Sequence, residues 1–421
     1  MSLISQMSFQ NPWWTQSSSI DDDDHVRRAK YYLPPIRENL LILGPRQVGK
    51  TTYMKTVIRD LLREVEPRKV FYFSCDSLSR KDELIQLLNE YRTLVNGDEA
   101  FIFLDEITSV DAWNMGLLHL FNAGYFRNSL VYVSGSSSLN LSRETLPGRP
   151  LRKVVYYPLN FRVYFDLFTR KLDVPTLPVT SPREIMKEAK KLIPHLSALN
   201  KALLSYVERG GFFATNLSSA SLYETYRDTV LSEIAKTGRS EALFKQVISR
   251  IIESYGSRIS DNGISKEISV SHTTVSEYLE LLERLFITRT YRKWENGRVN
   301  YRSLKKVYMI DPFLFRVMKR YSLGKDLETE DIPHVIEGIV GEHLSREYAE
   351  SLFTFFKDGR EVDFLVRGIG IEVKWSERVR SRPKAPEYVL TMDEFDEERR
   401  LIPVSLFLYL ISSDKVFYDL G

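Results

Sequence analysis

Short apolar runs recur through the first third of the chain, and segments with helical spacing of apolar residues separate them. Short apolar runs that alternate with helices are typical of buried parallel strands. We therefore predict an α/β fold in this region, with a parallel sheet and helices on both of its faces. The predicted strands cover residues 40–43, 70–74, 100–104, 130–134 and 151–156.

The first predicted strand leads into a glycine-rich loop, Gly44-Pro-Arg-Gln-Val-Gly-Lys-Thr51, and helical spacing follows it at 53–64. The loop fits G-x-x-x-x-G-K-[ST], and a strand, loop and helix in this order point backbone N–H groups at a phosphate. This predicts ATP binding, with Lys50 on the β- and γ-phosphates and the Thr51 hydroxyl on Mg²⁺. The predicted nucleotide contacts are Gly44, Pro45, Arg46, Gln47, Val48, Gly49, Lys50, Thr51 and Thr52.

Two carboxylates follow the third predicted strand. Asp105 comes directly after the apolar run 100–104, and Glu106 is the next residue. The strand places Asp105 at its C-terminal tip, where a P-loop enzyme needs a further Mg²⁺ ligand. Glu106 points elsewhere and can polarise the attacking water. We therefore predict Lys50, Asp105 and Glu106 as catalytic residues of ATP hydrolysis.

Three further polar residues are candidates for the same site. Ser134 and Ser136 lie at the tip of the fourth predicted strand, where a hydroxyl could sense the γ-phosphate or hold the water. A serine-rich turn without a role in binding is the alternative. Arg149 could complete a phosphate site in its own chain or, in a homo-oligomer, in a neighbour's. The alternative for Arg149 is an ordinary surface arginine in a turn.

Together these motifs resemble the AAA+-type ATPases that are widespread in archaea and bacteria. The matching pieces are the loop 44–52, Phe-Leu-Asp-Glu-Ile at 103–107, Ser-Gly-Ser-Ser-Ser at 134–138, Pro-Gly-Arg at 147–149, Tyr-Pro-Leu-Asn-Phe at 157–161 and Gly-Gly-Phe at 210–212. The resemblance implies ATP and Mg²⁺ as cofactors and a P-loop core over residues 1–170. It also implies a helical lid over 171–240, where helical spacing is found at 183–208 and 219–236.

The middle of the chain predicts a winged helix-turn-helix over residues 241–312. Three helical segments are followed by two strands, and Asn296-Gly297 supplies a tight hairpin turn between the strands. Ser271 is placed to cap the third helix. The predicted helices cover 241–255, 264–268 and 272–285, and the predicted strands cover 287–294 and 298–309.

Residues 284–306 contain eight basic residues and one acid, Glu295, with aromatic residues between them. Such a local excess is a credible surface for a phosphate backbone. The alternative is a winged helix that packs against protein, with a solvated basic hairpin. The residues that we predict to contact DNA are Arg289, Arg292, Lys293, Arg298 and Arg302.

The C-terminal third carries Asp363 on one predicted strand and Glu372-x-Lys374 on the next. Asp363 and Glu372 could share a divalent metal, and Lys374 could position the water nucleophile. Glu342, or Glu337, on a preceding helix could supply a further acid. These pieces resemble the PD-(D/E)XK restriction-endonuclease-like α/β fold, which implies a nuclease-like domain over 313–421. The alternative is a relic of that fold whose acids only solvate their strands.

Composition limits these interpretations. A net charge of +3 does not by itself imply a polyanionic partner, so any nucleic-acid signal must be local. The single cysteine, Cys75, excludes an internal disulfide framework and indicates a reducing, cytoplasmic setting. The sequence has no apolar stretch of membrane-spanning length, so we expect no membrane partner.

We therefore expect an α/β multidomain ATPase that is coupled to DNA binding, with metal-dependent DNA cleavage or remodelling as a further option. The alternative is a nucleotide-gated switch or scaffold, whose C-terminal domain is catalytically inactive and binds protein rather than DNA.

Overall fold

The computed structural model of the chain describes residues 3–29, 33–96, 99–136, 151–216, 222–355, 361–375 and 387–419. The chain divides into two compact units. The first unit is Met1–Tyr157 with Phe417–Gly421, and the second unit is Pro158–Val416. The sequence predicts four domains, and the predicted boundaries at 170, 240 and 312 all fall inside the second unit.

The first unit is built on a six-stranded sheet in the order β14-β5-β1-β4-β3-β2. Strands β1 to β5 are parallel, and β14 pairs antiparallel with β5. The mostly parallel sheet that the sequence predicts is therefore confirmed. The strands are β1 (Leu40–Leu43), β2 (Val70–Ser74), β3 (Ala100–Asp105), β4 (Ser129–Gly135), β5 (Arg152–Tyr156) and β14 (Phe417–Asp419).

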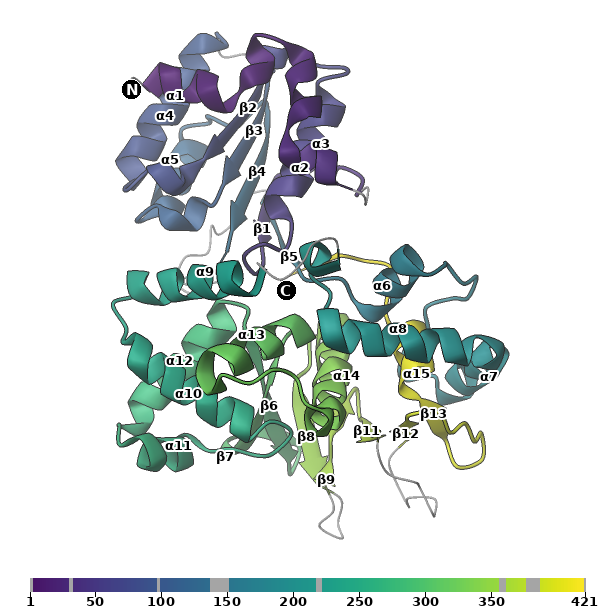
Figure 1. Cartoon of the computed structure of the whole chain (residues 1–421). Coiled ribbons are helices and arrows are strands. Elements are labelled where there is room, and N and C mark those ends of the chain that lie inside the picture. Colours follow the sequence, from purple (N-terminus) through teal and green to yellow (C-terminus); the bar gives the residue numbers. More distant parts are fainter. Residues whose placement is uncertain are drawn as a thin grey trace. The chain divides into compact units, whose positions relative to one another are not determined.

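Helices cover both faces of this sheet (Figure 1). Helix α3 buries Tyr53, Met54 and Val57 because apolar residues at this spacing share one side of a helix. α2 and α3 lie on one face of the sheet, and α4 and α5 lie on the other. The helices are α1 (Leu3–Gln10), α2 (Asp24–Arg28), α3 (Lys50–Leu61), α4 (Lys81–Leu94) and α5 (Trp113–Asn122).

Strand β14 is a part of the first unit that the sequence does not predict. The chain returns from the second unit at Phe417 and adds three residues to the edge of the sheet beside β5. The Phe417 ring centroid lies 4.8 Å from that of Tyr53 on α3 and 4.9 Å from that of Tyr156 on β5. Asp419 pairs with Arg152 at 2.7 Å. The tail therefore packs against the helix that follows the P-loop.

The second unit begins with helices. The segment predicted as helical at 183–208 contains α7 and α8, with a short 3₁₀ turn at Ile193–His195 between them. Pro194 explains the break, because proline has no N–H to donate to the preceding turn. The helices are α6 (Phe161–Phe168), α7 (Pro182–Leu192), α8 (Leu196–Arg209) and α9 (Leu222–Lys236).

Three helices and a hairpin follow in the order that the sequence predicts for a winged helix-turn-helix. Ser271 caps the third helix by accepting a hydrogen bond from the Thr274 N–H. Asn296 and Gly297 have φ angles of 51° and 75°, as a tight two-residue hairpin turn requires. The elements are α10 (Glu241–Glu253), α11 (Asp261–Ile268), α12 (His272–Arg284), β6 (Thr288–Glu295) and β7 (Arg298–Met309).

This hairpin belongs to a larger sheet with the order β7-β6-β8-β9. β6 pairs in parallel with β8 (Leu352–Phe355), and β8 pairs antiparallel with β9 (Glu361–Val362). β6 and β7 precede residue 312, whereas β8 and β9 follow it. Backbone hydrogen bonds therefore join the segments that the sequence assigns to a winged helix and to a nuclease-like domain.

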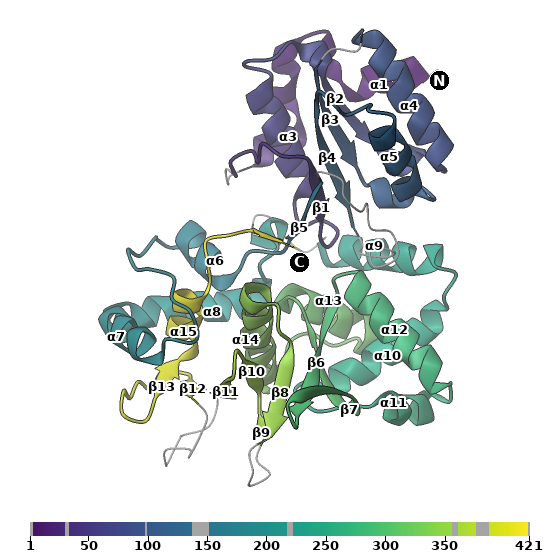
Figure 2. The same ribbon diagram turned by 180° about the vertical axis from the view of Figure 1, so that it is seen from behind.

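A second four-stranded sheet of the second unit has the order β10-β11-β12-β13. β10 and β11 form an antiparallel hairpin, and β11, β12 and β13 are parallel. Helices α14 and α15 pack along these strands (Figure 2). The elements are α13 (Pro312–Leu323), α14 (Ile332–Tyr348), β10 (Phe364–Val366), β11 (Ile369–Lys374), β12 (Tyr388–Thr391), β13 (Leu401–Pro403) and α15 (Val404–Ile411).

Candidate functional site

The glycine-rich loop 44–51 joins β1 to α3 in the first unit. A Cβ at Gly44 would lie 2.2 Å from the carbonyl oxygen of Tyr156, so no larger residue fits there. Lys50 is 4% exposed, and its ammonium donates to the carbonyl oxygens of Gly44 and Pro45, both at 2.9 Å. The loop thus holds a positive charge at the N-terminus of a helix, where anions bind.

Asp105 lies at the end of β3 and is 2% exposed. One of its carboxylate oxygens accepts hydrogen bonds from the Thr51 hydroxyl at 2.6 Å and from the Tyr72 hydroxyl at 2.9 Å. The other accepts from the Ser134 hydroxyl. Burial and the charge of Asp105 raise the pKa of Tyr72, so this phenol stays protonated and remains a donor. The structure therefore brings Thr51 and Asp105 together as predicted, and it adds Tyr72, which sequence reasoning missed.

Glu106 adopts a left-handed backbone conformation, with φ of 51°, directly after β3. Its N–H donates to the Ser134 hydroxyl oxygen at 3.1 Å and to Asp105 at 3.2 Å. Its carboxylate pairs with Arg46 of the loop at 3.5 Å through one oxygen. The second oxygen, Oε2, is buried and accepts no hydrogen bond from any described residue. A buried carboxylate oxygen that lacks a partner can take a proton from water.

Thr51 and Asp105 also fit a magnesium ion. Their hydroxyl and carboxylate oxygens are 2.6 Å apart, and Mg²⁺ prefers oxygen ligands. Within the described ranges, no group of three or more His, Cys, Asp and Glu side chains is placed to hold a metal ion. That finding is compatible with magnesium here, because Mg²⁺ in phosphoryl-transfer sites takes few protein ligands and binds phosphate oxygens as well.

The N-terminal segment supports this site from the edge of the sheet. Asn11 bonds both backbone groups of Tyr72, donating to its oxygen at 2.8 Å and accepting from its N–H at 2.7 Å. Trp13 and Trp14 each donate an indole N–H to the Val70 carbonyl oxygen at 3.0 Å. β2 is the edge strand of the sheet, so Asn11 bonds backbone groups that a neighbouring strand would otherwise pair. It thereby fixes Tyr72, whose hydroxyl donates to Asp105.

The remaining predictions for the first unit have different outcomes. Ser136 is 3% exposed and follows β4, but the hydroxyl that reaches Asp105 belongs to Ser134. Arg149 lies outside the described residues. Cys75 is fully buried, and burial raises the pKa of its thiol, as expected for an inert cysteine.

Most of the basic residues at 284–306 meet acids in the second unit. The pairs are Arg284 with Glu280, Arg289 with Glu342, Lys293 with Glu295, Lys305 with Asp261, and Lys306 with Glu337, Glu361 and Asp363. Arg292 lies over the Tyr301 ring at 5.1 Å, and Tyr301 is 71% exposed. Arg298 is exposed at the start of β7, and the side chain of Arg302 is outside the described part. The predicted DNA-binding surface therefore contracts to the tip of the hairpin.

The acids predicted for a nuclease-like site have different partners in the structure. Asp363 lies between β9 and β10, where it accepts from the Lys306 ammonium at 3.0 Å and from the Val373 N–H at 2.9 Å. Glu372 and Lys374 share one face of β11, as alternation predicts, and pair with each other at 3.1 Å. Asp363 and Lys374 line the same cavity, which has a volume of about 540 Å³.

Lys306 stands at the centre of an acidic cluster formed by Glu337, Glu361 and Asp363. Its ammonium lies 2.8 Å from Glu337, 2.5 Å from Glu361 and 3.0 Å from Asp363. Burial disfavours the charged ammonium, but the three carboxylates outweigh burial and raise the pKa of Lys306. The acid of α14 beside Asp363 is thus Glu337, and the Lys306 ammonium contacts an oxygen of each acid in this cluster.

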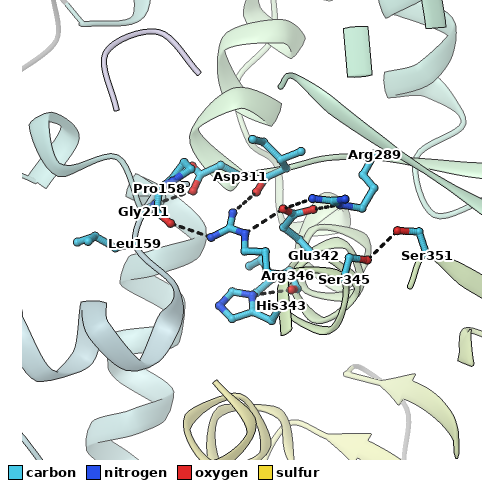
Figure 3. Close-up of polar contacts among 12 residues, drawn as sticks. Pro158, Leu159, Gly211, Arg289, Asp311, Glu342, His343, Ser345, Arg346 and Ser351 are labelled. Atoms are coloured by element: carbon cyan, nitrogen blue, oxygen red, sulfur yellow. Dashed lines mark hydrogen bonds and ion pairs between the residues drawn. The ribbon is translucent and has the colours of Figure 1, made fainter. Parts of the chain in front are cut away.

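Glu342, which we predict as a metal ligand, lies instead between two arginines (Figure 3). Its carboxylate accepts from Arg289 at 2.5 and 3.0 Å and from Arg346 at 2.9 Å. Arg346 also donates to the carbonyl oxygens of Pro158 at 2.7 Å and Ile310 at 2.9 Å. Burial alone would raise the pKa of Glu342, but the arginines lower it. This corrects the metal-ligand prediction for Glu342, because guanidinium groups occupy its oxygens.

Two motifs of the second unit meet beside this ion pair. Asp311 accepts from the Gly211 N–H at 2.8 Å and from the Phe313 N–H at 2.9 Å. A Cβ at Gly210 would lie 2.0 Å from the Asp311 carboxylate, which explains the glycine at that position. Burial raises the pKa of Asp311 to about 7. Hydrogen bonds therefore join Gly210-Gly211-Phe212 after α8 to Asp311-Pro312-Phe313 at the start of α13.

His343 is a neutral imidazole in the same buried region. Its Nδ1 bonds the Ile339 carbonyl oxygen at 2.7 Å, and its Nε2 accepts from the Phe161 N–H at 2.8 Å. If Nε2 carried a proton, its N–H would face the Phe161 N–H, and neither donor would have an acceptor. Burial, with a smaller contribution from the charge of Arg346, lowers the pKa of His343 to about 3. Folding therefore holds this imidazole in its neutral form.

We expect acid to destabilise the second unit through His343. In the unfolded chain the imidazole binds a proton near pH 6.5, whereas in the folded chain it does so near pH 3. Its contribution to the free energy of unfolding is complete above pH 6.5 and is lost on going down toward pH 3. The loss should be about 2 kcal/mol at pH 5.

Urea unfolding of the wild type and His343→Gln at pH 7 and pH 5 measures this contribution. Glutamine keeps an acceptor for the Phe161 N–H and does not titrate, so it should remove about 2 kcal/mol of the pH dependence. The difference between the two chains cancels the opposite contribution of Asp311, whose raised pKa favours the folded state as pH falls. Equal pH dependence in both chains would refute the neutral imidazole.

Comparison with known protein families finds a match for the N-terminal part of the chain and another for its middle. Residues 37–165 match the family model of an AAA domain, and residues 200–325 match a domain of unknown function (DUF8612). The matched AAA region contains the loop, β3, Asp105 and Glu106. The first unit therefore has an AAA-type P-loop fold.

Three relatives match at low identity, one over about a third of its own length and two over most of it. The uncharacterized protein MJ1637 of Methanocaldococcus jannaschii is 30% identical over 154 residues, which span 35% of this chain and 32% of that protein. An uncharacterized protein of Haemophilus influenzae is 23% identical and covers 78% of this chain and 79% of its own length. The M. jannaschii protein MJ1544 is 23% identical over 83% of this chain and 78% of its own.

A solved structure, Cdc6p from Pyrobaculum aerophilum, aligns with 76% of this chain and 95% of its own at 12% identity and a TM-score of 0.25, too low to imply a shared fold. Among the helices that the structure describes, none has the length and apolar character needed to cross a membrane.

Proposed function

We propose that this chain is a Mg²⁺-dependent ATPase whose nucleotide site is the loop 44–52 with Asp105 and Glu106. One observation carries the proposal: the Thr51 hydroxyl bonds the Asp105 carboxylate at the end of β3, and the buried Oε2 of the adjacent Glu106 accepts no hydrogen bond from the residues that the structure describes. A phosphate cradle, metal ligands and a base for water are the parts that phosphoryl transfer to water needs.

Each residue has a distinct role in this proposal. The backbone of the loop and the Lys50 ammonium bind the phosphates. Thr51 and Asp105 would hold Mg²⁺, which would neutralise charge that develops on the phosphate oxygens. Tyr72 and the hydroxyl of Ser134 fix the Asp105 carboxylate by hydrogen bonds. Glu106 takes a proton from the attacking water.

ATP binding by Lys50→Ala tests the nucleotide site. Loss of the ammonium should weaken ATP binding by about 10- to 100-fold, since hydrogen bonds to charged groups are worth roughly 1.5–3 kcal/mol. Equilibrium titration with a fluorescent ATP analogue measures the change. Lys69→Ala is the matched control because Lys69 precedes β2, at the opposite end of the parallel strands. Equal affinity in Lys50→Ala and the control would reject the site.

In this proposal, the nucleotide state of the first unit controls the binding activity of the second unit. The chain leaves the first unit after β5 and re-enters it at β14, and these two strands pair with each other. A change of the sheet on ATP binding therefore reaches the second unit through two adjacent chain connections. DNA binding remains our proposal for this unit, through the hairpin tip with Arg292, Arg298 and Tyr301. A homo-oligomer completed by Arg149 is a further proposal.

The alternative output, a protein-binding scaffold, also has an observation in its favour. Among the basic side chains at 284–306 that the structure describes, at least five are paired with carboxylates, which leaves less charge for a phosphate backbone. Metal-dependent cleavage is not part of the proposal, because lysines pair with the acids that would hold the metal: Lys306 with Asp363 and Glu337, and Lys374 with Glu372.

A salt titration of DNA binding separates the two outputs. Each lost phosphate contact lowers the slope of log K against log salt by about 1, so Arg292→Ala with Arg298→Ala should lower it by about 2. Arg284→Ala is the control, since Arg284 already pairs with Glu280. Duplex and single-stranded DNA are both measured by fluorescence anisotropy. Binding that is absent, or that is insensitive to salt and to the hairpin substitutions, would favour the protein scaffold.

A further inference from the structure

The acidic cluster of Glu337, Glu361 and Asp363 pairs with a cation of the same chain, the Lys306 ammonium. Lys306 lies on β7, opposite Tyr291 of β6, and its side chain is 2% exposed. An ammonium has three N–H donors, and here it faces three carboxylates, Glu337 of α14 and the nearby Glu361 and Asp363 at β9. The donors and the acceptors are therefore matched in number and brought together by the fold.

Further donors satisfy the same carboxylates. Glu337 also accepts from the Tyr308 hydroxyl at 2.6 Å. Glu361 pairs in addition with Arg258 at 3.1 Å, and the second oxygen of Asp363 accepts from a backbone N–H of β11 at 2.9 Å. Each carboxylate of the cluster thus has at least two hydrogen-bond or ion-pair partners from the protein, and none of them depends on a metal for a partner.

A divalent metal and the lysine would compete for one position. Mg²⁺ sits about 2.0–2.1 Å from its oxygen ligands. The Lys306 nitrogen is 2.5–3.0 Å from an oxygen of each acid. A metal bound to these oxygens would come within the contact distance of that nitrogen, and two cations repel each other strongly in a buried site.

We propose that Lys306 is the resident cation of this cluster and that it excludes a divalent metal from the nuclease-like site of the native chain. The proposal concerns the second unit and does not depend on ATP hydrolysis by the first. It predicts a gain of function: removing the ammonium without changing the acids should create a metal site.

Mn²⁺ binding to the full chain tests this prediction. All chains carry Asp105→Asn, which removes a carboxylate ligand of the nucleotide site, and they are measured without nucleotide. Lys306→Met keeps the length of the side chain and removes its charge. Lys305→Met is the matched control, because Lys305 is a neighbouring, 9% exposed lysine that pairs with an acid outside the cluster, Asp261. Free Mn²⁺ is followed by its electron paramagnetic resonance signal, and thermal unfolding is followed in parallel.

We expect Lys306→Met to gain about one Mn²⁺ per chain and to be stabilised by Mn²⁺, because ligand binding to the folded state raises its melting temperature. Adding Asp363→Asn to Lys306→Met should abolish the gain, and Lys305→Met should show none. A folded Lys306→Met chain that gains no site would overturn the proposal.

The native cluster gives an independent test that does not require any Lys306 variant to fold. Mn²⁺ titration of the chain with Lys306 intact should show no site that Asp363→Asn removes. A site that is present with Lys306 and lost on Asp363→Asn would overturn the proposal, and its absence supports it.

Discussion

Glu106→Gln should leave ATP bound and lower its turnover by about 100- to 10,000-fold, the usual contribution of a general base. Glutamine has the same shape but cannot accept a proton from water. The buried Oε2 of Glu106 has no hydrogen-bond partner among the described residues, so a water can use it as an acceptor. The left-handed backbone at Glu106 accompanies hydrogen bonds from its N–H to Asp105 and to the Ser134 hydroxyl oxygen, so the residue is held in place directly after the metal ligand.

Phosphate release under saturating ATP, together with ATP retention on a filter, measures both parts of this prediction. Glu64→Gln is a matched control, because Glu64 is exposed just beyond the end of α3 and should not affect either quantity. Wild-type turnover in Glu106→Gln would show that another group activates the water. Loss of ATP binding would show that Glu106 acts in binding, through its contact with Arg46 of the loop.

The second large effect concerns stability. Arg346→Met should lower the free energy of unfolding of the second unit by about 3 kcal/mol, the low end of the cost of breaking a buried ion pair, because Arg289 still pairs with Glu342. Arg346 and Glu342 have side chains that are only 1% and 2% exposed. The substitution also removes the donors for the carbonyl oxygens of Pro158 and Ile310.

Hydrogen exchange of the α14 amides measures this loss within the second unit. Arg250→Met is the matched control, since Arg250 also pairs with a glutamate on its own helix but is 40% exposed. Exposed pairs of this kind contribute about 0–1 kcal/mol. Replacing Glu342 by leucine as well should recover part of the loss, because no buried carboxylate is then left without Arg346. Equal exchange rates in Arg346→Met and the control would contradict the structural role.

The local sequence pattern was sufficient to predict strands β1 to β5 of the first unit and the loop between β1 and α3. The strand runs, the glycine loop and the acidic strand end each lie within a few consecutive residues, and the apolar character of β1 and β3 fixes where Thr51 and Asp105 meet. Tyr72 was missed because its hydroxyl reaches Asp105 from a neighbouring strand, and a strand pattern does not name its neighbours. β14 was missed because three residues carry too little periodicity to predict a strand.

In the second unit, counting the charged residues between 284 and 306 did not reveal their ion pairs, because several of the acidic partners lie far away in the sequence. Between residues 284 and 306 the count shows one acid, yet Arg289 meets Glu342 and Lys306 meets Glu337 and Asp363. Secondary structure was easier to predict, since Ser271 and the Asn296-Gly297 turn act on adjacent residues. Glu342 shows the same distinction: its helix and the i,i+4 position of Arg346 were predictable from spacing, whereas Arg289, which lies far earlier in the sequence, was not.

Mg²⁺-dependent ATP hydrolysis by the wild type and Lys50→Ala is the most direct test of the central claim. We expect the wild type to release phosphate from ATP only when Mg²⁺ is present, and Lys50→Ala to release it no faster than buffer. The Lys69→Ala control should retain the wild-type rate. Undiminished hydrolysis by Lys50→Ala, or hydrolysis that persists unchanged after Mg²⁺ is chelated, would contradict the assignment of this loop as the site of an ATPase.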